Sequence, residues 1–121
     1  MQIVGTLTEQ VAALLRIDLP ADRNIYFGET NRIHMLSDHP AAYEKYGELI
    51  PEILGAPDYV RQSERDGSIE YVNECRIDEE YVKVAVRASS SDRLYARTLY
   101  VLNRSRAEHF IASGKLIPVS D

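Results

Sequence analysis

The chain of 121 residues is long enough for one folded domain, and its 45% hydrophobic and 27% charged residues are ordinary for a globular protein. No stretch approaches the roughly 20 apolar residues that span a bilayer, and the first residues lack the basic and apolar regions of a signal peptide. A single cysteine, Cys75, excludes an internal disulfide and a cysteine-rich zinc site. We therefore expect a cytoplasmic protein that forms one domain over residues 1–121 and contacts no membrane.

The formal charge of −5 argues against strong nucleic-acid binding, because phosphate recognition usually requires a basic surface. The charge is unevenly distributed, however. Acidic residues dominate residues 38–80, and basic residues outnumber acidic ones from Tyr81 onward. A local basic face is therefore compatible with an acidic chain.

The first half of the chain shows mainly helical patterns. Residues 7–16 are the first predicted helix, and Thr6 and Glu9 at its start have the spacing of a capping box. Residues 25–27 form a short apolar run that predicts an extended segment. A short helix at residues 30–35 is followed by a helix through residue 46, with Asp38 or His39 as its N-cap and Pro40 in its first turn. A further short helix is expected at residues 51–54.

The second half changes to the alternating pattern of strands, which are predicted at residues 59–61, 69–76, 81–88 and 94–102. The clearest alternation is in the third of these, where Val82, Val84 and Val86 share one face and Lys83, Ala85 and Arg87 share the other. Asn103 or Ser105 caps a last helix. The order of elements predicts an α+β fold, in which N-terminal helices pack on a C-terminal four-stranded antiparallel β-meander with a closing helix.

Two histidines, His34 and His39, lie five residues apart with Pro40 directly after the second. This spacing is poor for a metal pair on one helix, where neighbours are three or four residues apart, and the chain has no H-E-x-x-H motif. We expect no metal and no cofactor. Taken alone, the pattern favours His34 as a partly buried helix residue and His39 as a helix cap.

The polar residues of the predicted strands have two interpretations. Lys83 and Arg87 share a strand face, which favours a solvated surface opposite the valines and leaves open a pair of cations aimed at a phosphate. Thr98 and Tyr100 share a side of their strand with Ala96. Strand parity alone does not separate structural from functional roles for these residues.

Three segments in sequence carry a resemblance to a known group of proteins: residues 33–40 (IHMLSDHP), 53–60 (ILGAPDYV) and 97–100 (RTLY). Their order resembles the phage and mobile-element nuclease-like families of the barnase–EndoU–colicin–RelE group. In those families an H-x4-H-P element precedes a turn of the form I-x-x-N-P-D-x-V, and a late strand carries a Thr followed by an aromatic residue. The resemblance covers residues 26–112, with Ala56 at the usual Asn position.

The resemblance implies a metal-independent endoribonuclease of the toxin or phage-effector type. RNA cleavage without metal uses the 2′-hydroxyl to attack its own phosphate, so one group accepts the 2′ proton and another protonates the leaving 5′ oxygen. A histidine can do either, and fixed cations stabilise the charge on the phosphate. The two histidines are not ranked as acid and base. The implied catalytic residues are His34, His39, Arg87, Thr98 and Tyr100, and the implied substrate-binding residues are Lys83 and Arg97.

Two other functions remain open. The same scaffold could be a non-catalytic RNA- or protein-binding module, and its partners would then be RNA or a protein such as an antitoxin or a host protein. It could also be an inhibitor that mimics nucleic acid, although a solvated strand edge that prevents aggregation explains the same acidic residues more simply. Those acidic residues are Glu64, Asp66, Glu70, Glu74, Asp78, Glu79 and Glu80.

Overall fold

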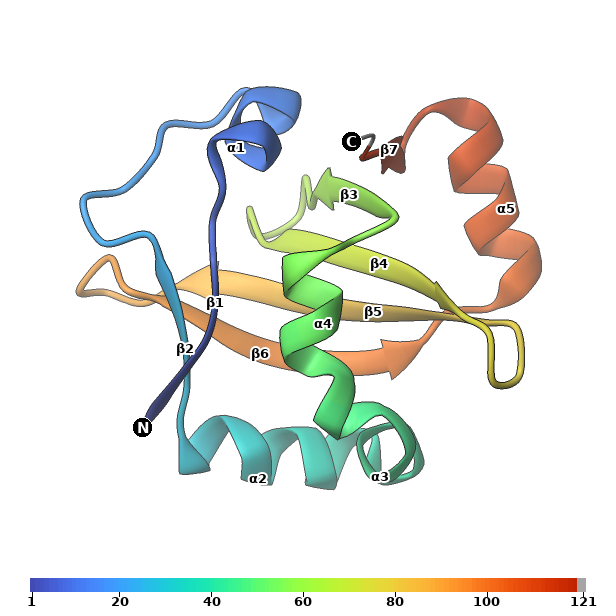
Figure 1. Cartoon of the computed structure of the whole chain (residues 1–121), viewed down its shortest axis with the longest axis horizontal. Helices are drawn as coiled ribbons and strands as arrows, with labels where there is room; N and C mark the ends of the chain where they lie inside the picture. The colour runs from blue at the N-terminus through green and yellow to red at the C-terminus, as the bar shows by residue number, and fades with distance from the viewer. Residues whose placement is uncertain (120–121) are drawn as a thin grey trace.

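The computed structural model describes residues 1–119, in which seven strands form one mixed sheet flanked by helices (Figure 1). The order across the sheet is β1-β2-β6-β5-β4-β3-β7. The α+β class is therefore confirmed, and the sheet is larger than the four strands expected. The strands are β1 (Gln2–Thr6), β2 (Asn24–Phe27), β3 (Tyr59–Gln62), β4 (Ile69–Cys75), β5 (Glu80–Ala88), β6 (Leu94–Val101) and β7 (Ile117–Pro118).

The centre of the sheet is formed by β3, β4, β5 and β6, which are neighbours in chain order and pair antiparallel. The two faces of β5 follow the alternation of its sequence, although residues on both faces are buried. Val82, Val84 and Val86 are fully buried in the main core, and Lys83 and Arg87 lie on the opposite face. The central strands therefore place the predicted cations on the face away from the main core.

Three strands extend the sheet beyond the four predicted ones, and one of them, β2, coincides with the extended segment predicted at residues 25–27. β1 pairs antiparallel with β2, β2 pairs parallel with β6 through Ile25 and Leu94, and β7 pairs antiparallel with β3. The first half is mainly helical, as expected, but it also supplies one edge of the sheet, which the sequence patterns did not predict. The parallel pairing brings the start of β6 against the chain segment that leads into α2.

The helices divide between the two faces of the sheet. Buried side chains of α1 (Glu9–Leu15), α2 (Glu29–Asp38), α3 (Pro40–Tyr46) and α4 (Ile50–Gly55) join the main core, and a 3-10 turn (Gly47–Leu49) links α3 to α4. The last helix, α5 (Arg104–Ser113), packs through Ala107 on Val72 and Tyr81 in a separate small core (Figure 1). Among residues 1–119, no helix is long and apolar enough to cross a membrane.

Side-chain and backbone caps fix the helix ends. The hydroxyl of Thr8, rather than the predicted Thr6, accepts the Val11 N–H at 3.2 Å and begins α1. His39 ends α2 and precedes Pro40 at the start of α3, which confirms the predicted boundary there. The Asn103 side chain accepts the Arg106 N–H at 3.0 Å and begins α5. The α2–α3 corner therefore holds His39 in a fixed place beside the sheet.

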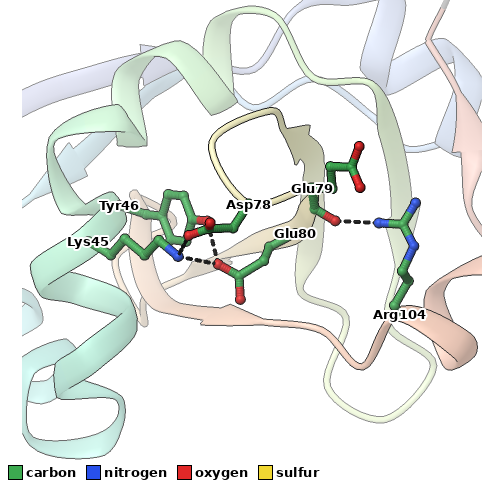
Figure 2. Close-up of polar contacts among 6 residues, drawn as sticks. All are labelled: Lys45, Tyr46, Asp78, Glu79, Glu80 and Arg104. Carbon is green, nitrogen blue, oxygen red and sulfur yellow. Dashed lines mark hydrogen bonds and ion pairs between the residues drawn. The ribbon is translucent and has the colours of Figure 1, made fainter.

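A polar cluster ties the β4–β5 turn to α3 (Figure 2). The Lys45 ammonium donates to Asp78 and to Glu80, and the latter contact is 2.7 Å long. The buried Tyr46 hydroxyl donates to the same Glu80 carboxylate at 2.6 Å. Burial, together with this carboxylate, raises the pKa of Tyr46 to about 12. The cluster therefore holds the β4–β5 turn in place against α3.

The Glu80 contacts predict a pH-dependent contribution to stability. Hydrogen bonds from Lys45 and then Tyr46 lower the pKa of Glu80 below its ordinary value of 4.5. A lowered pKa in the folded state stabilises the protein above pH 4.5, and this gain is lost as the pH falls below that value. We expect Glu80→Gln to lower the urea midpoint of unfolding at pH 7. The difference in midpoint between the variant and the wild type should decrease as the pH is lowered. Glu48→Gln, at an exposed position, is the matched control. A midpoint difference between Glu80→Gln and the wild type that is as large at acid pH as at pH 7 would contradict the stabilising role of the Glu80 carboxylate.

Candidate active-site cleft

A cleft runs along the sheet face that carries Lys83 and α5. It has two adjoining sections, of about 490 Å³ and about 160 Å³. The larger section reaches α5 at Arg106 and Phe110, and the smaller one reaches Arg87, Arg97 and Thr98. Both sections share the lining residues Ser63, Arg65, Glu70, Lys83 and Tyr100. We call the two together the sheet cleft.

The sheet cleft is basic although the chain is acidic. Among residues 1–119, six cationic side chains and three carboxylates line it, which gives a formal charge of +3 against −5 for the whole chain. Local concentration of cations in a concave site attracts anionic ligands. A different hollow, of about 580 Å³ between α4 and β4, is lined by Glu52, Asp58 and Glu74 and suits a phosphate poorly. The negative charge of the whole chain is therefore no argument against anion binding in the sheet cleft.

A buried ion pair forms the floor of the sheet cleft. The Lys83 ammonium lies 3.0 Å from one Glu70 oxygen, and the Arg61 guanidinium lies 3.2 Å from the other. The side chains of Glu70 and Lys83 are each 11% exposed. Lys83 also lies 4.4 Å from the centre of the Tyr100 ring, within the range of a cation–π contact. The interpretation of Lys83 as part of a solvated face is therefore wrong, as is that of Glu70 as part of a solvated edge.

An irregularity in β6 brings two consecutive side chains into the smaller section. Ala85 pairs with Thr98 and Val86 pairs with Ala96, so the register skips Arg97 and forms a β-bulge there. As a result Arg97 and Thr98 both line the cleft, whereas Ala96 is fully buried in the main core. The expectation that Ala96 shares a side with Thr98 and Tyr100 is wrong because the bulge changes the parity of the strand. Bulges are frequent beside active sites, where they re-aim side chains.

His39 contacts a lining residue of the sheet cleft, Tyr100, although His39 is not itself among the described lining residues. Its ring stacks on Tyr100 with the ring centres 4.9 Å apart and the planes 29° apart. The α2–α3 corner positions the imidazole, and Tyr100 itself lines both sections of the cleft. His34 is exposed on α2, rather than partly buried as its pattern suggested, and is not among the described residues that line the cleft. The fold therefore places one of the two predicted histidines beside the predicted strand residues.

Arg87 lies at the open end of the smaller section. It forms an ion pair of 3.5 Å with Asp66 in the β3–β4 turn, and its side chain is 44% exposed. The Ser68 N–H donates to Asp66 at 3.0 Å, and this bond is the main reason that the pKa of Asp66 is lowered. The turn is therefore structured by Asp66, and the exposed Arg87 guanidinium can still reach a ligand.

The acidic residues considered for nucleic-acid mimicry are largely paired with cations. Besides Glu70 and Asp66, Glu74 pairs with Arg104 at 3.1 Å, and Asp78 and Glu80 pair with Lys45. These contacts offset negative charge on this part of the surface. Within residues 1–119, no three His, Cys, Asp or Glu side chains are grouped as a metal-binding set.

The structure also brings in residues that the sequence patterns did not single out as functional. Glu70 and Arg61 are part of the buried floor, and Arg65 and Phe110 line the walls. The position of Glu70 could have been predicted in part, because strand alternation places it on the face opposite Ile69 and Tyr71. Its pairing with Lys83 required the register of the β4–β5 hairpin, in which Val72 lies opposite Lys83.

Comparison with known protein families identifies the family of the chain. A protein-family model described as phage-Barnase-EndoU-ColicinE5/D-RelE like nuclease3 matches residues 1–109. No curated protein and no solved structure matches the chain. The matched range includes His39, the bulge in β6 and the buried pair of Glu70 and Lys83.

Proposed function

Because the chain belongs to the phage-Barnase-EndoU-ColicinE5/D-RelE like nuclease3 family, we propose that its sheet cleft is the active site of an endoribonuclease that acts without a metal ion. The proposal rests on one observation: side chains that are far apart in the sequence lie together at one cationic cleft. His39 stacks on Tyr100, and Tyr100 lines the cleft together with Lys83, Arg97 and Thr98. These are a proton-transfer group, cations and a hydroxyl donor.

The cations are placed to bind the phosphate of the scissile bond. Arg87 and Arg97 offer guanidinium groups, which match phosphate oxygens in two-point hydrogen bonds. Lys83 is held in position by Glu70 and Tyr100, so its charge needs little reorganisation during the reaction. Thr98 can donate its hydroxyl to a phosphate oxygen. Fixed positive charge of this kind stabilises the developing charge on phosphorus without a metal ion.

Two groups of the cleft can exchange protons with the RNA. Because Glu70 is ion-paired as a carboxylate, it can accept a proton but has none to donate. We therefore assign Glu70 as the general base and His39, as imidazolium, as the general acid. The 2′ oxygen gives its proton to Glu70 and bonds to phosphorus. The bond from phosphorus to the 5′ oxygen breaks as His39 protonates that oxygen, which yields a 2′,3′-cyclic phosphate and a 5′-hydroxyl end.

The test uses purified protein with end-labelled RNA in a buffer that contains EDTA. We expect fragments that end in 2′,3′-cyclic phosphate, and we expect DNA of the same sequence to stay intact because it lacks the attacking hydroxyl. RNA that is bound but remains uncut would instead support a non-catalytic binding module. Cleavage that requires added Mg²⁺ and leaves 5′-phosphate ends would overturn the proposed chemistry.

A further inference from the structure

The α5 end of the sheet cleft carries an aromatic side chain that the proposed chemistry does not use. Phe110 is partly buried against the small core that includes Ala107 and Leu116. Its ring nevertheless lines the larger section of the cleft. It lies just beyond residues 1–109, the range of the family match.

Three cations surround the Phe110 ring. The charged groups of Arg61, Arg106 and Lys115 lie 5.2, 5.3 and 5.3 Å from its centre. Arg61 is engaged with Glu70, whereas Arg106 and Lys115 belong to exposed residues. An aromatic ring with adjacent exposed cations is the combination that binds single-stranded nucleic acid, because bases stack on the ring and cations follow the backbone.

This aromatic face is continuous with the proposed reaction centre. Lys83 and Tyr100 line the section that contains Phe110 and also the section that contains Arg97 and Thr98. The volume of the larger section, about 490 Å³, is within the range of small-ligand pockets, about 300–1,000 Å³. A strand whose phosphate lies at Arg97 can therefore extend along the same cleft toward α5.

We propose that Phe110 forms a subsite for the base of the nucleotide next to the two that the scissile bond joins, and that Arg106 and Lys115 bind the phosphate that links this nucleotide to them. The inference rests on the proposed function, because it extends the same cleft along the same strand. Its occupant is single-stranded RNA, since the cations favour a phosphate backbone and the ring favours a planar base. Stacking of this kind tolerates any base, so the subsite should increase the affinity for longer RNA without selecting a particular base sequence.

The test compares short substrates that have a single cleavable position. The first is a dinucleotide with one ribonucleotide, and the others carry one more deoxynucleotide on the 5′ or the 3′ side. A third set replaces the base of the added nucleotide by an abasic site. For the wild type we expect one of the two extended substrates to exceed its abasic version about tenfold in kcat/KM, because only the added base can stack on Phe110 and the added phosphate is common to both.

Two variants separate stacking from packing. Phe110→Leu keeps an apolar side chain against the small core and removes the aromatic ring, so it should abolish the difference between the extended substrate and its abasic version. Phe110→Trp keeps a ring and should keep that difference. A tenfold difference that survives in Phe110→Leu would overturn the inference, as would the absence of a difference in the wild type.

The same substrates distinguish an error in the subsite from an error in the proposed nuclease activity. If the wild type cuts none of these substrates, the nuclease assignment fails. The subsite is then decided by fluorescence anisotropy with labelled, fully deoxy trinucleotides. Weaker binding of the intact trinucleotide by Phe110→Leu, together with weaker binding of the abasic trinucleotide by the wild type, would support the subsite. Equal affinities would overturn it.

Discussion

Replacing His39 by alanine is expected to lower kcat/KM for RNA cleavage by about 10²–10⁴-fold, the usual contribution of a general acid. The imidazole is beside the cleft, stacked on Tyr100, and we assign it the proton that the leaving 5′ oxygen receives. Stability should change little, because His39 is exposed and its side chain makes no cap hydrogen bond. Initial rates with a labelled RNA and a thermal unfolding curve for each variant are the measurements.

His34→Ala is the matched control for this prediction. His34 is also an exposed histidine, five residues earlier on α2, and the ring contact with Tyr100 belongs to His39. We expect its rate to equal that of the wild type, and the parallel purification also controls for contaminating ribonuclease. Loss of cleavage in His34→Ala with full cleavage in His39→Ala would reverse the assignment of the two histidines.

Replacing Lys83 by methionine is expected to lower the free energy of unfolding by about 3 kcal/mol, the lower end of the range for one partner of a buried ion pair. The substitution leaves the Glu70 carboxylate at 8% exposure without its closest cation. Arg61 still pairs with Glu70 at 3.2 Å, which moderates the loss. Urea unfolding at neutral pH measures the change.

The double variant Glu70→Leu/Lys83→Met separates stability from catalysis. Replacement of a buried ion pair by apolar side chains of similar volume is often close to neutral, so the double variant should recover most of the lost stability. It should remain inactive on RNA, because it lacks both the proposed base and a phosphate-binding cation. A stable, active double variant would show that the pair serves the fold alone, and a Lys83→Met protein of unchanged stability would show that the pair is effectively solvated.

Sequence patterns predicted the parts of the fold that depend on local periodicity. The alternation of Val82, Val84 and Val86 gave the buried face of β5, and Pro40 marked the α2–α3 corner. Strands β1 and β7 were not predicted, and the extended segment predicted at residues 25–27 was not placed in the sheet, because these pairings are long-range. β1 has little alternation and pairs with β2, and β2 joins the sheet through a parallel contact with β6 that no local pattern reveals.

The site was predictable in its residue types and less so in its arrangement. Thr98 and Tyr100 were singled out together, but the bulge that adds Arg97 to the same cleft depends on the register between β5 and β6. The contact of His39 with Tyr100 joins residues far apart in the chain, so no spacing in the sequence encodes it. The burial of Lys83 follows from its Glu70 partner on the adjacent strand, which requires the pairing of β4 with β5.

The central claim is that the sheet cleft is the place where RNA binds. Amide chemical-shift mapping with a 2′-O-methyl RNA, which cannot attack its own phosphate, tests this directly. The largest changes are expected at Arg97, Thr98 and Tyr100 on β6 and at His39, with further changes at Phe110 on α5. Changes confined to the β4–β5 turn, or to the hollow between α4 and β4, would contradict the account.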